Sequence, residues 1–263
     1  MYADNNVTVT GTGTRVMMFA HGFGCDQKMW RQVAPAFEDA YRVVLFDHVG
    51  AGRSNLAAFD PRKYSSLRGY ADDVLDICAR LEIRGGIFVG HSVSAMIGML
   101  AAIEQPACFS HLILIGPSPC YINRDITAFE ASDIEGLLEA LAANHLGWSQ
   151  DMAPVIMGNP DRPELATELK ESFCRTDPDI ARHFARTTFT SDNRADLERV
   201  QTPALILQCA EDVIAPTVVG EYVHARVQGS ELVHLEATGH CPNVSAPAEV
   251  VREIQRYLER RAA

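Results

Sequence analysis

Three residue types stand along this chain in an order that could perform nucleophilic catalysis. The stretch "GHSVSA" (90–95) contains Ser92, and Asp212 and His240 follow far downstream. A serine hydroxyl attacks a carbonyl carbon when a neighbouring histidine removes its proton and a carboxylate orients that histidine. We therefore predict a catalytic triad of Ser92, Asp212 and His240.

Ser92 and Ser94 compete for the role of nucleophile. The stretch departs from the pattern Gly-x-Ser-x-Gly, because Ser94 stands where the second glycine belongs. Small residues two places before and after the nucleophile let the backbone approach itself closely in a tight strand-to-helix turn. Gly90 and Ser94 fill these places, and the Ser94 hydroxyl can bond to a backbone carbonyl. We predict that Ser92 is the nucleophile and that Ser94 is structural.

The acid and the histidine each have one competitor. In folds with this kind of turn, the acid follows a late strand and the histidine follows the last one. Asp212 lies on a loop just past an apolar run, and Glu211 is its rival. His240 lies on the loop after the last apolar run, whereas His234 alternates within that run and is predicted to pack. Position therefore favours Asp212 and His240.

Two backbone groups could stabilise the negative charge that develops on the attacked oxygen. Such a charge needs preorganised N–H donors, one of which comes from the residue after the nucleophile. That residue is Val93, and the loop "HGFG" (21–24) after an early apolar run offers the second donor. We predict an oxyanion hole formed by the N–H groups of Phe23 and Val93.

Short β-rich runs that are apolar on both faces alternate with longer helical segments. These runs lie at 16–20, 43–46, 87–89, 112–115 and 205–207. They are typical of parallel strands covered by helices, and the alternation over 7–10 predicts an antiparallel edge strand. The pattern predicts a doubly wound α/β sheet that positions the catalytic residues at its carboxyl edge.

One region breaks this alternation. Residues 119–200 contain no convincing buried strand, but they contain helical spacing at 134–146, 163–173 and 178–189. A structureless loop of this length would be unusual in a compact protein. We predict an α/β core at 1–118 and 201–263, with a helical cap (119–200) inserted after the sixth strand.

Composition and charge argue against several classes of partner. The chain has 263 residues, is 47% hydrophobic and carries a formal net charge of −11. Because nucleic-acid binding needs a basic face and no basic run is present, we expect no nucleic acid. No apolar run approaches the roughly 20 residues that span a bilayer, and the first residues lack the layout of a signal peptide. We therefore expect no membrane partner and a cytoplasmic location.

The sequence offers no motif for a metal or a cofactor. Its seven cysteines are irregularly spaced and form no Cys-x-x-Cys pair, which argues against a zinc site. The glycine pairs at 11–13 and 50–52 are too short for a dinucleotide site. We expect no metal and no cofactor.

Several longer motifs extend this pattern. They read "HGFGCDQKMW" (21–30), "LFDHVGAGRS" (45–54), "GHSVSAMIGMLAA" (90–102), "LIGPSPCYIN" (114–123), "LILQCAEDVIAP" (205–216) and "EATGHCPNVSAP" (236–247). With them the chain resembles an α/β-hydrolase, and more closely the RsbQ type of bacterial stress-response regulator and the plant karrikin and strigolactone receptors.

The resemblance implies the same triad and oxyanion donors, four cap helices arranged as a V over an apolar pocket, and a slow hydrolase. Some members of this group also sense small molecules. If the chain has a regulatory role, the resemblance implies that its partner is a PAS-domain phosphatase-type signalling protein.

Aromatic side chains of the cap could line the pocket. Together with Phe23, which lies beside the predicted oxyanion hole, we expect this role for Phe129, Trp148, Phe184 and Phe189. The alternative for each cap residue is ordinary packing between helices.

The main functional hypothesis is a serine hydrolase, of the carboxylic ester hydrolase type, that acts on a small, mostly apolar ester or lactone through an acyl-enzyme. The alternative is a signalling regulator or sensor whose triad processes a signal ligand. Carbon–carbon bond cleavage is a weaker alternative, and a dehalogenase is disfavoured because it needs an aspartate in place of Ser92.

Overall fold

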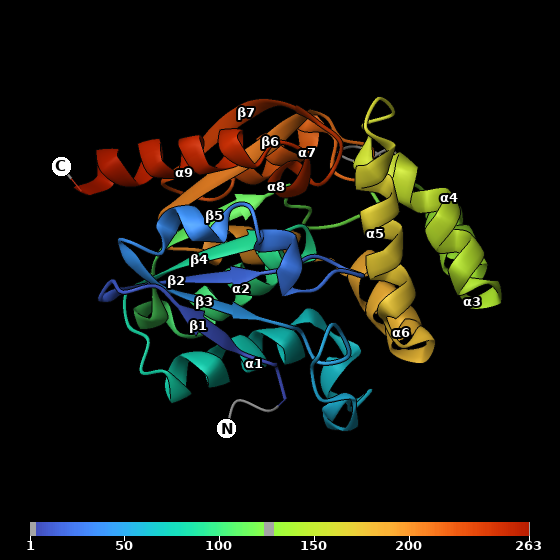
Figure 1. Cartoon of the computed structure of the whole chain (residues 1–263), viewed down its shortest axis with the longest axis horizontal. Helices are drawn as coiled ribbons and strands as arrows, with labels where there is room; N and C mark the ends of the chain where they lie inside the picture. Colours follow the sequence, from blue (N-terminus) through green and yellow to red (C-terminus); the bar gives the residue numbers. More distant parts are fainter. Residues whose placement is uncertain (1–3, 124–128, 263) are drawn as a thin grey trace.

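The centre of the molecule is a twisted sheet (Figure 1). The computed structural model describes residues 4–123 and 129–262. The sheet has seven strands in the order β1-β3-β2-β4-β5-β6-β7. The strands are β1 (Thr8–Thr10), β2 (Arg15–Ala20), β3 (Tyr41–Phe46), β4 (Gly86–His91), β5 (Phe109–Ile115), β6 (Ala204–Glu211) and β7 (Ser230–Thr238). Only the pairing of β1 with β3 is antiparallel, so the predicted mostly parallel sheet with one antiparallel edge strand is confirmed.

Helices cover both faces of the sheet, as the doubly apolar strands require. On one face lie α1 (Leu67–Arg80), α2 (Val93–Glu104) and α7 (Thr217–His224); on the other lie α8 (Pro242–Ser245) and α9 (Pro247–Ala262). Neighbouring side chains of β2 illustrate the division, because Met18 packs with the α1–α2 cluster and Met17 with the α9 cluster. Both methionines are fully buried, and a shift of one residue in register would exchange the two faces.

Four α-helices lie between β5 and β6 in the described residues 129–203. They are α3 (Ala131–Ala143), α4 (His145–Met157), α5 (Pro163–Arg175) and α6 (Pro178–Phe189), and we call them the cap helices. The insertion follows the fifth strand of the sheet, so its predicted place after a sixth strand is wrong. Residues 4–123 form only five strands, because the connections between them are turns and helices. The domain boundaries at 118 and 200 stay a prediction.

Helix α4 is the cap helix that the sequence pattern missed. It contains Gly147 near its start and Pro154 in its last turn, two residues that weaken a helical pattern. Its ends are nevertheless well formed, since the Asn144 side chain accepts from the Gly147 amide and Gly158 ends the helix in the left-handed conformation. Leu146 is 63% exposed on this helix, which further blurs the apolar spacing.

The cap helices lie beyond the carboxyl ends of the strands (Figure 1). Helix α5 packs its Phe173 ring so tightly against Gly24, after β2, that a side chain at Gly24 would overlap it. Helix α6 does the same with Ile180 at Gly50, after β3. These contacts place the cap over the edge where the predicted catalytic residues meet. Among residues 4–123 and 129–262, no helix has the length and apolar character needed to cross a membrane.

Candidate active site

Ser92 occupies a strained turn between β4 and α2. Its backbone has φ 57° and ψ −124°, a conformation that costs a non-glycine residue of the order of 1–3 kcal/mol. The Ser92 amide donates to the Ile115 carbonyl of β5 (2.8 Å), and the turn is so tight that a Cβ at Gly90 would lie 2.5 Å from the Ser94 carbonyl oxygen. The surrounding sheet thus holds one side chain above its carboxyl edge in a geometry that glycine would otherwise occupy.

Asp212 lies on the loop after β6, where backbone donors fix its carboxylate. Its Oδ1 accepts from the amides of Ile214 (2.9 Å) and Ala215 (3.0 Å). Burial acts to raise the pKa of Asp212, but the neighbouring His240 and these two donors outweigh burial and hold the pKa below its usual value. The carboxylate is therefore ionised at neutral pH. Glu211, the alternative acid, is exposed to solvent.

His240 lies on the loop after β7 and is held from two sides. Gly239, at φ +80°, donates its amide to the Glu211 carbonyl (2.6 Å), and the His240 amide donates to the Ile156 carbonyl of α4 (2.8 Å). Cap and core therefore meet at this loop. His234, the alternative histidine, is exposed to solvent in β7, so the prediction that it packs is wrong.

One chain of hydrogen bonds joins the three predicted residues. The Nδ1–H of His240 donates to Asp212 Oδ2 (2.7 Å), which leaves Nε2 free to accept from the Ser92 hydroxyl (2.7 Å). Ser92, Asp212 and His240 are 6%, 6% and 4% exposed, so the whole chain of hydrogen bonds is buried. In this tautomer the imidazole is oriented to take the serine proton. The geometry agrees with the predicted triad, whose catalytic role stays a prediction.

The two predicted oxyanion donors lie next to Ser92, one in the chain and one on the loop after β2. Val93 is the first residue of α2, so its N–H is one of those that the helix itself leaves unpaired. Phe23 follows Gly22, where a Cβ would lie 2.6 Å from His91 Nδ1 and 3.4 Å from the Ser92 Cβ. Glycine at position 22 thus lets the loop after β2 come directly against the nucleophile turn.

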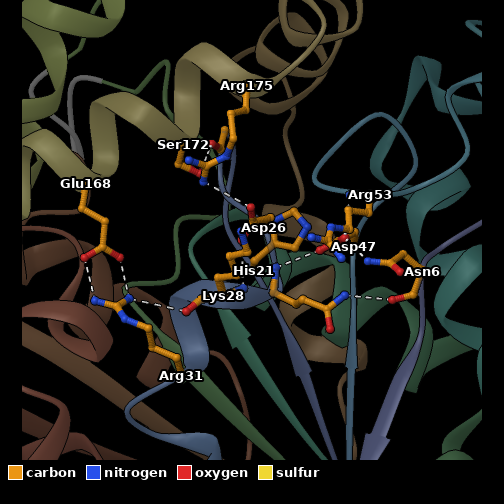
Figure 2. A network of polar contacts seen from close by, with 12 residues as sticks. Asn6, His21, Asp26, Lys28, Arg31, Asp47, Arg53, Glu168, Ser172 and Arg175 are labelled. Carbon is orange, nitrogen blue, oxygen red and sulfur yellow. Dashed lines mark hydrogen bonds and ion pairs between the residues drawn. The ribbon is translucent and has the colours of Figure 1, made fainter.

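The loop after β2 is also tied to the cap (Figure 2). Arg31 forms a two-bond ion pair with Glu168 of α5 (2.5 and 2.6 Å), and Arg175 pairs with Asp26 (3.2 Å). Both arginines are largely exposed, so each pair contributes only about 0–1 kcal/mol. Asp47, at the end of β3, accepts from the Gln27 amide (2.8 Å) and fixes the same loop from the core side.

His91 and Tyr121 contact the triad, and neither was among the predicted site residues. The Nε2–H of His91 donates to the His240 carbonyl (2.7 Å), and burial lowers the pKa of His91 to about 3. Burial raises the pKa of Tyr121, while a hydrogen bond between its side chain and Ser92 acts in the opposite direction. Both residues stand in the quoted motifs, next to Ser92 and at the end of "GPSPCY", and this position was their only signal.

A small apolar cavity of about 30 Å³ opens beside Ser92 and His240. Of the five side chains predicted to line it, Phe23 and Phe189 do so. Trp148 and Phe184 lie one layer behind, with ring centroids 6.2 Å and 5.8 Å from that of Phe23. Phe129 is half-buried against the α9-side cluster and outside the cavity wall. The wall also includes residues that the prediction lacked: Cys25, Ile156, Leu169, Phe173, Thr188, Ile214 and Cys241.

The sequence and the fold are both similar to those of known proteins. The family model described as "Alpha/beta hydrolase family" matches residues 17–253. A strigolactone esterase of Arabidopsis thaliana is 42% identical over 97% of this chain and 96% of its own, and a karrikin insensitive 2 receptor of Petunia hybrida is 38% identical over 97% and 95%. The solved structure of a hydrolase from Oleispira antarctica is 39% identical, with a TM-score of 0.95 over 97% of this chain and 95% of its own.

Proposed function

The chain belongs to the alpha/beta hydrolase family, and we propose that it is a serine hydrolase that cleaves a small, mostly apolar ester or lactone through an acyl-enzyme. The observation that carries the proposal is the buried hydrogen-bond chain from Ser92 through His240 to Asp212. The same three residues follow strands β4, β6 and β7 in the order that this kind of site requires.

The acylation step begins when Ser92 Oγ attacks the carbonyl carbon and its proton moves to His240 Nε2. The carbonyl electron pair moves onto the oxygen, which the N–H groups of Phe23 and Val93 stabilise. When the C–O bond to the leaving group breaks, His240 gives the proton to the departing alkoxide. In a lactone the alcohol stays attached to the acyl group, so ring opening leaves a hydroxyacyl-serine.

The deacylation step repeats the same proton transfers with water. His240 removes a proton from water as the water oxygen attacks the acyl carbon, and then returns a proton to Ser92 Oγ. The products are a carboxylic acid and a free enzyme. Asp212 stays ionised throughout because its pKa is lowered. Its negative charge stabilises the imidazolium of His240, which forms twice in each turnover.

Cavity size and lining favour a small substrate with little polarity. A cavity of about 30 Å³ is much smaller than an engineered cavity of about 150 Å³ that holds benzene, so an ester of several carbons needs additional room. Three wall residues, Cys25, Leu169 and Cys241, also border a neighbouring cavity of about 210 Å³ beneath α5. A shift of cap side chains toward this neighbouring space would admit the substrate.

Hydrolysis of p-nitrophenyl acetate, butyrate and octanoate by the wild type and by Ser92→Ala tests the proposal. We expect turnover of the short esters by the wild type and a loss of at least about 10³-fold in Ser92→Ala, with the melting temperature little changed. Ser110→Ala is the matched control, because Ser110 lies near the start of β5, far from the nucleophile turn. Ser94→Gly would be unsuitable, since it alters the same turn. Full activity in Ser92→Ala would overturn the proposal.

A second candidate function is small-molecule perception, in which slow turnover accompanies a signal. The similarity to a protein named as a karrikin insensitive 2 receptor favours it, as do the shared motifs. In this alternative the surface binds a PAS-domain phosphatase-type partner, and a gene for such a protein beside this one would support it. Fast ester turnover together with no partner on co-purification would count against it.

A further inference from the structure

A closed network of buried hydrogen bonds lies behind the oxyanion loop. The Ser94 hydroxyl donates to the His21 carbonyl (2.5 Å) and lies 2.7 Å from His48 Nε2. The His48 amide donates to His21 Nε2 (3.0 Å), and His21 Nδ1 lies 2.9 Å from the Gly22 carbonyl. Ser94, His48 and His21 are fully buried. Three segments that are distant in sequence therefore meet at one point.

The acceptors in this network assign every proton. A carbonyl oxygen can only accept a hydrogen bond, so the Ser94 hydroxyl donates its proton to the His21 carbonyl. The Ser94 oxygen must then accept from the Nε2–H of His48. Because His21 Nε2 accepts from an amide, its proton is on Nδ1 and is donated to Gly22. Burial lowers the pKa of both histidines, which agrees with neutral rings of fixed tautomer.

The last bond of the network sets the direction of the Phe23 N–H. The carbonyl of Gly22 and the N–H of Phe23 belong to one peptide unit, which is trans, so the two groups point in opposite directions. The Gly22 carbonyl accepts from His21 and from the Cys25 amide (3.2 Å), which fixes the plane of that unit. Rotation of His21 would therefore rotate the Phe23 donor with it.

We propose that Ser94 and His48 are positioning residues that hold His21, and through it the Gly22–Phe23 peptide, in the orientation that presents the Phe23 N–H to the reacting oxygen. The inference rests on the proposed hydrolase function and on Phe23 as an oxyanion donor. It assigns a role to the serine that replaces the second glycine of the nucleophile motif. Glycine there would leave both His21 and His48 short of one hydrogen-bond partner.

This role differs from local satisfaction of the helix. A helical serine commonly bonds to the carbonyl four residues earlier, as Ser149 does with His145 (2.7 Å). Ser94 instead bonds to a carbonyl 73 positions away in the chain. The close approach expected of a small residue falls to Gly90, whose missing Cβ leaves room for the Ser94 carbonyl. The side chain of Ser94 is thus available to reach the oxyanion loop.

Ser94→Ala tests the inference, with Ser149→Ala as the matched control. Removal of an oxyanion donor itself costs about 10²–10³ in kcat, so misorientation of one donor should cost about 10–100-fold. We expect this loss in kcat with p-nitrophenyl acetate, a KM within about twofold of the wild type, and an equal loss of affinity for a short alkyl trifluoromethyl ketone, which forms an oxyanion on Ser92. Ser149→Ala should leave all three quantities unchanged.

His48→Phe provides a second route, because it keeps the ring packing and removes the donor to Ser94. We expect the same separation of kcat from KM, and no further loss when it is combined with Ser94→Ala. The inference is overturned if both single variants fold and keep kcat within about twofold of the wild type. It is also overturned if the loss of activity lies in a higher KM, with kcat and the affinity for the ketone unchanged. Because Ser92→Ala tests the hydrolase function separately, a dead Ser92 variant beside an active Ser94 variant would reject this inference alone.

Discussion

Ser92 and His240 meet at one hydrogen bond, but different parts of the molecule hold them. The Ser92 turn is fixed by the sheet and by α2, whose residues 93–102 are all buried. The loop of His240 is fixed partly by the cap, through the bond from its amide to Ile156 and through Gly239, which lies directly against the Met157 carbonyl of α4. The nucleophile thus belongs to the core, whereas the base is shared between core and cap.

This difference suggests how substrate admission and catalysis are linked. A displacement of α4 would leave the Ser92 turn in place, because within residues 4–123 and 129–262 the backbone bonds of this turn go to β5 and α2 and not to the cap helices. The same displacement would strain the bond from His240 to Ile156 and change the distance from Nε2 to Ser92. Changes on the two sides should therefore have distinguishable consequences.

The largest expected effect comes from removal of either member of the pair. Ser92→Ala and His240→Ala should each lower kcat for p-nitrophenyl acetate by about 10⁶-fold, as in other triads, and the double variant should lose no more than the worse single one, because the two residues act as a unit. Measured losses that multiply in the double variant would contradict a joint role.

Asp212→Asn should have the next largest effect. The amide can present an N–H to His240 Nδ1 and so favour the wrong tautomer, a change that costs about 10⁴ in kcat in other triads. Glu211→Gln is the matched control, since that carboxylate is exposed and should leave kcat unchanged. A larger loss of kcat in Glu211→Gln than in Asp212→Asn would show that Glu211, and not Asp212, is the acid of the triad.

Gly239→Ala disturbs the contact between the His240 loop and helix α4 of the cap and leaves the Ser92 turn unchanged. Gly239 has φ +80° and no room for a side chain beside Met157, whereas Gly229 has φ +75° with nothing within 4 Å. Gly229→Ala should cost about 1–2 kcal/mol of stability from the backbone alone and leave kcat unchanged. Gly239→Ala should show a greater loss of stability and a fall in kcat of about tenfold or more. Equal kcat values in the two variants would show that this loop does not depend on α4.

The smallest effect concerns acid stability. His91 has a folded pKa of about 3, below its unfolded value near 6.5, so burial disfavours the charged ring. Above pH 6.5 the ring is neutral in both the folded and the unfolded state, so it does not change the free energy of unfolding. As the pH falls from 6.5 toward 3, only the unfolded state takes up the proton, and the folded state loses stability. His91→Gln, which keeps a side-chain N–H donor, should reduce this slope in urea unfolding measured between pH 3 and 7. An unchanged slope in His91→Gln would contradict the assignment.

The sequence predicted which residues meet at the carboxyl edge of the sheet better than it predicted which residues line the cavity. Ser92, Asp212 and His240 each follow a strand that local apolar runs identify, and a parallel sheet brings such loops to one edge. Whether a cap side chain faces the cavity depends on how helices pack on one another, which helical spacing does not encode. Trp148 and Phe184 were therefore expected in the wall but lie behind Phe23, and Phe173 was missed although its ring contacts Phe23 at 6.1 Å between centroids.

Ser94 shows the same limit within the nucleophile motif. A bond from its hydroxyl to a backbone carbonyl was expected from its place in the helix. The structure places that carbonyl at His21, on the loop after β2. Sequence distance concealed this contact, because its partner depends on the parallel pairing of β2 with β4.

Covalent labelling tests the central claim most directly. The wild type is treated with an alkyl fluorophosphonate, digested and mapped by mass spectrometry, alongside Ser92→Ala and His240→Ala. The account predicts one adduct on Ser92, no labelling of Ser92→Ala, and labelling of His240→Ala that is slower by orders of magnitude. An adduct on Ser94, or ester hydrolysis that continues with Ser92 unlabelled, would contradict it.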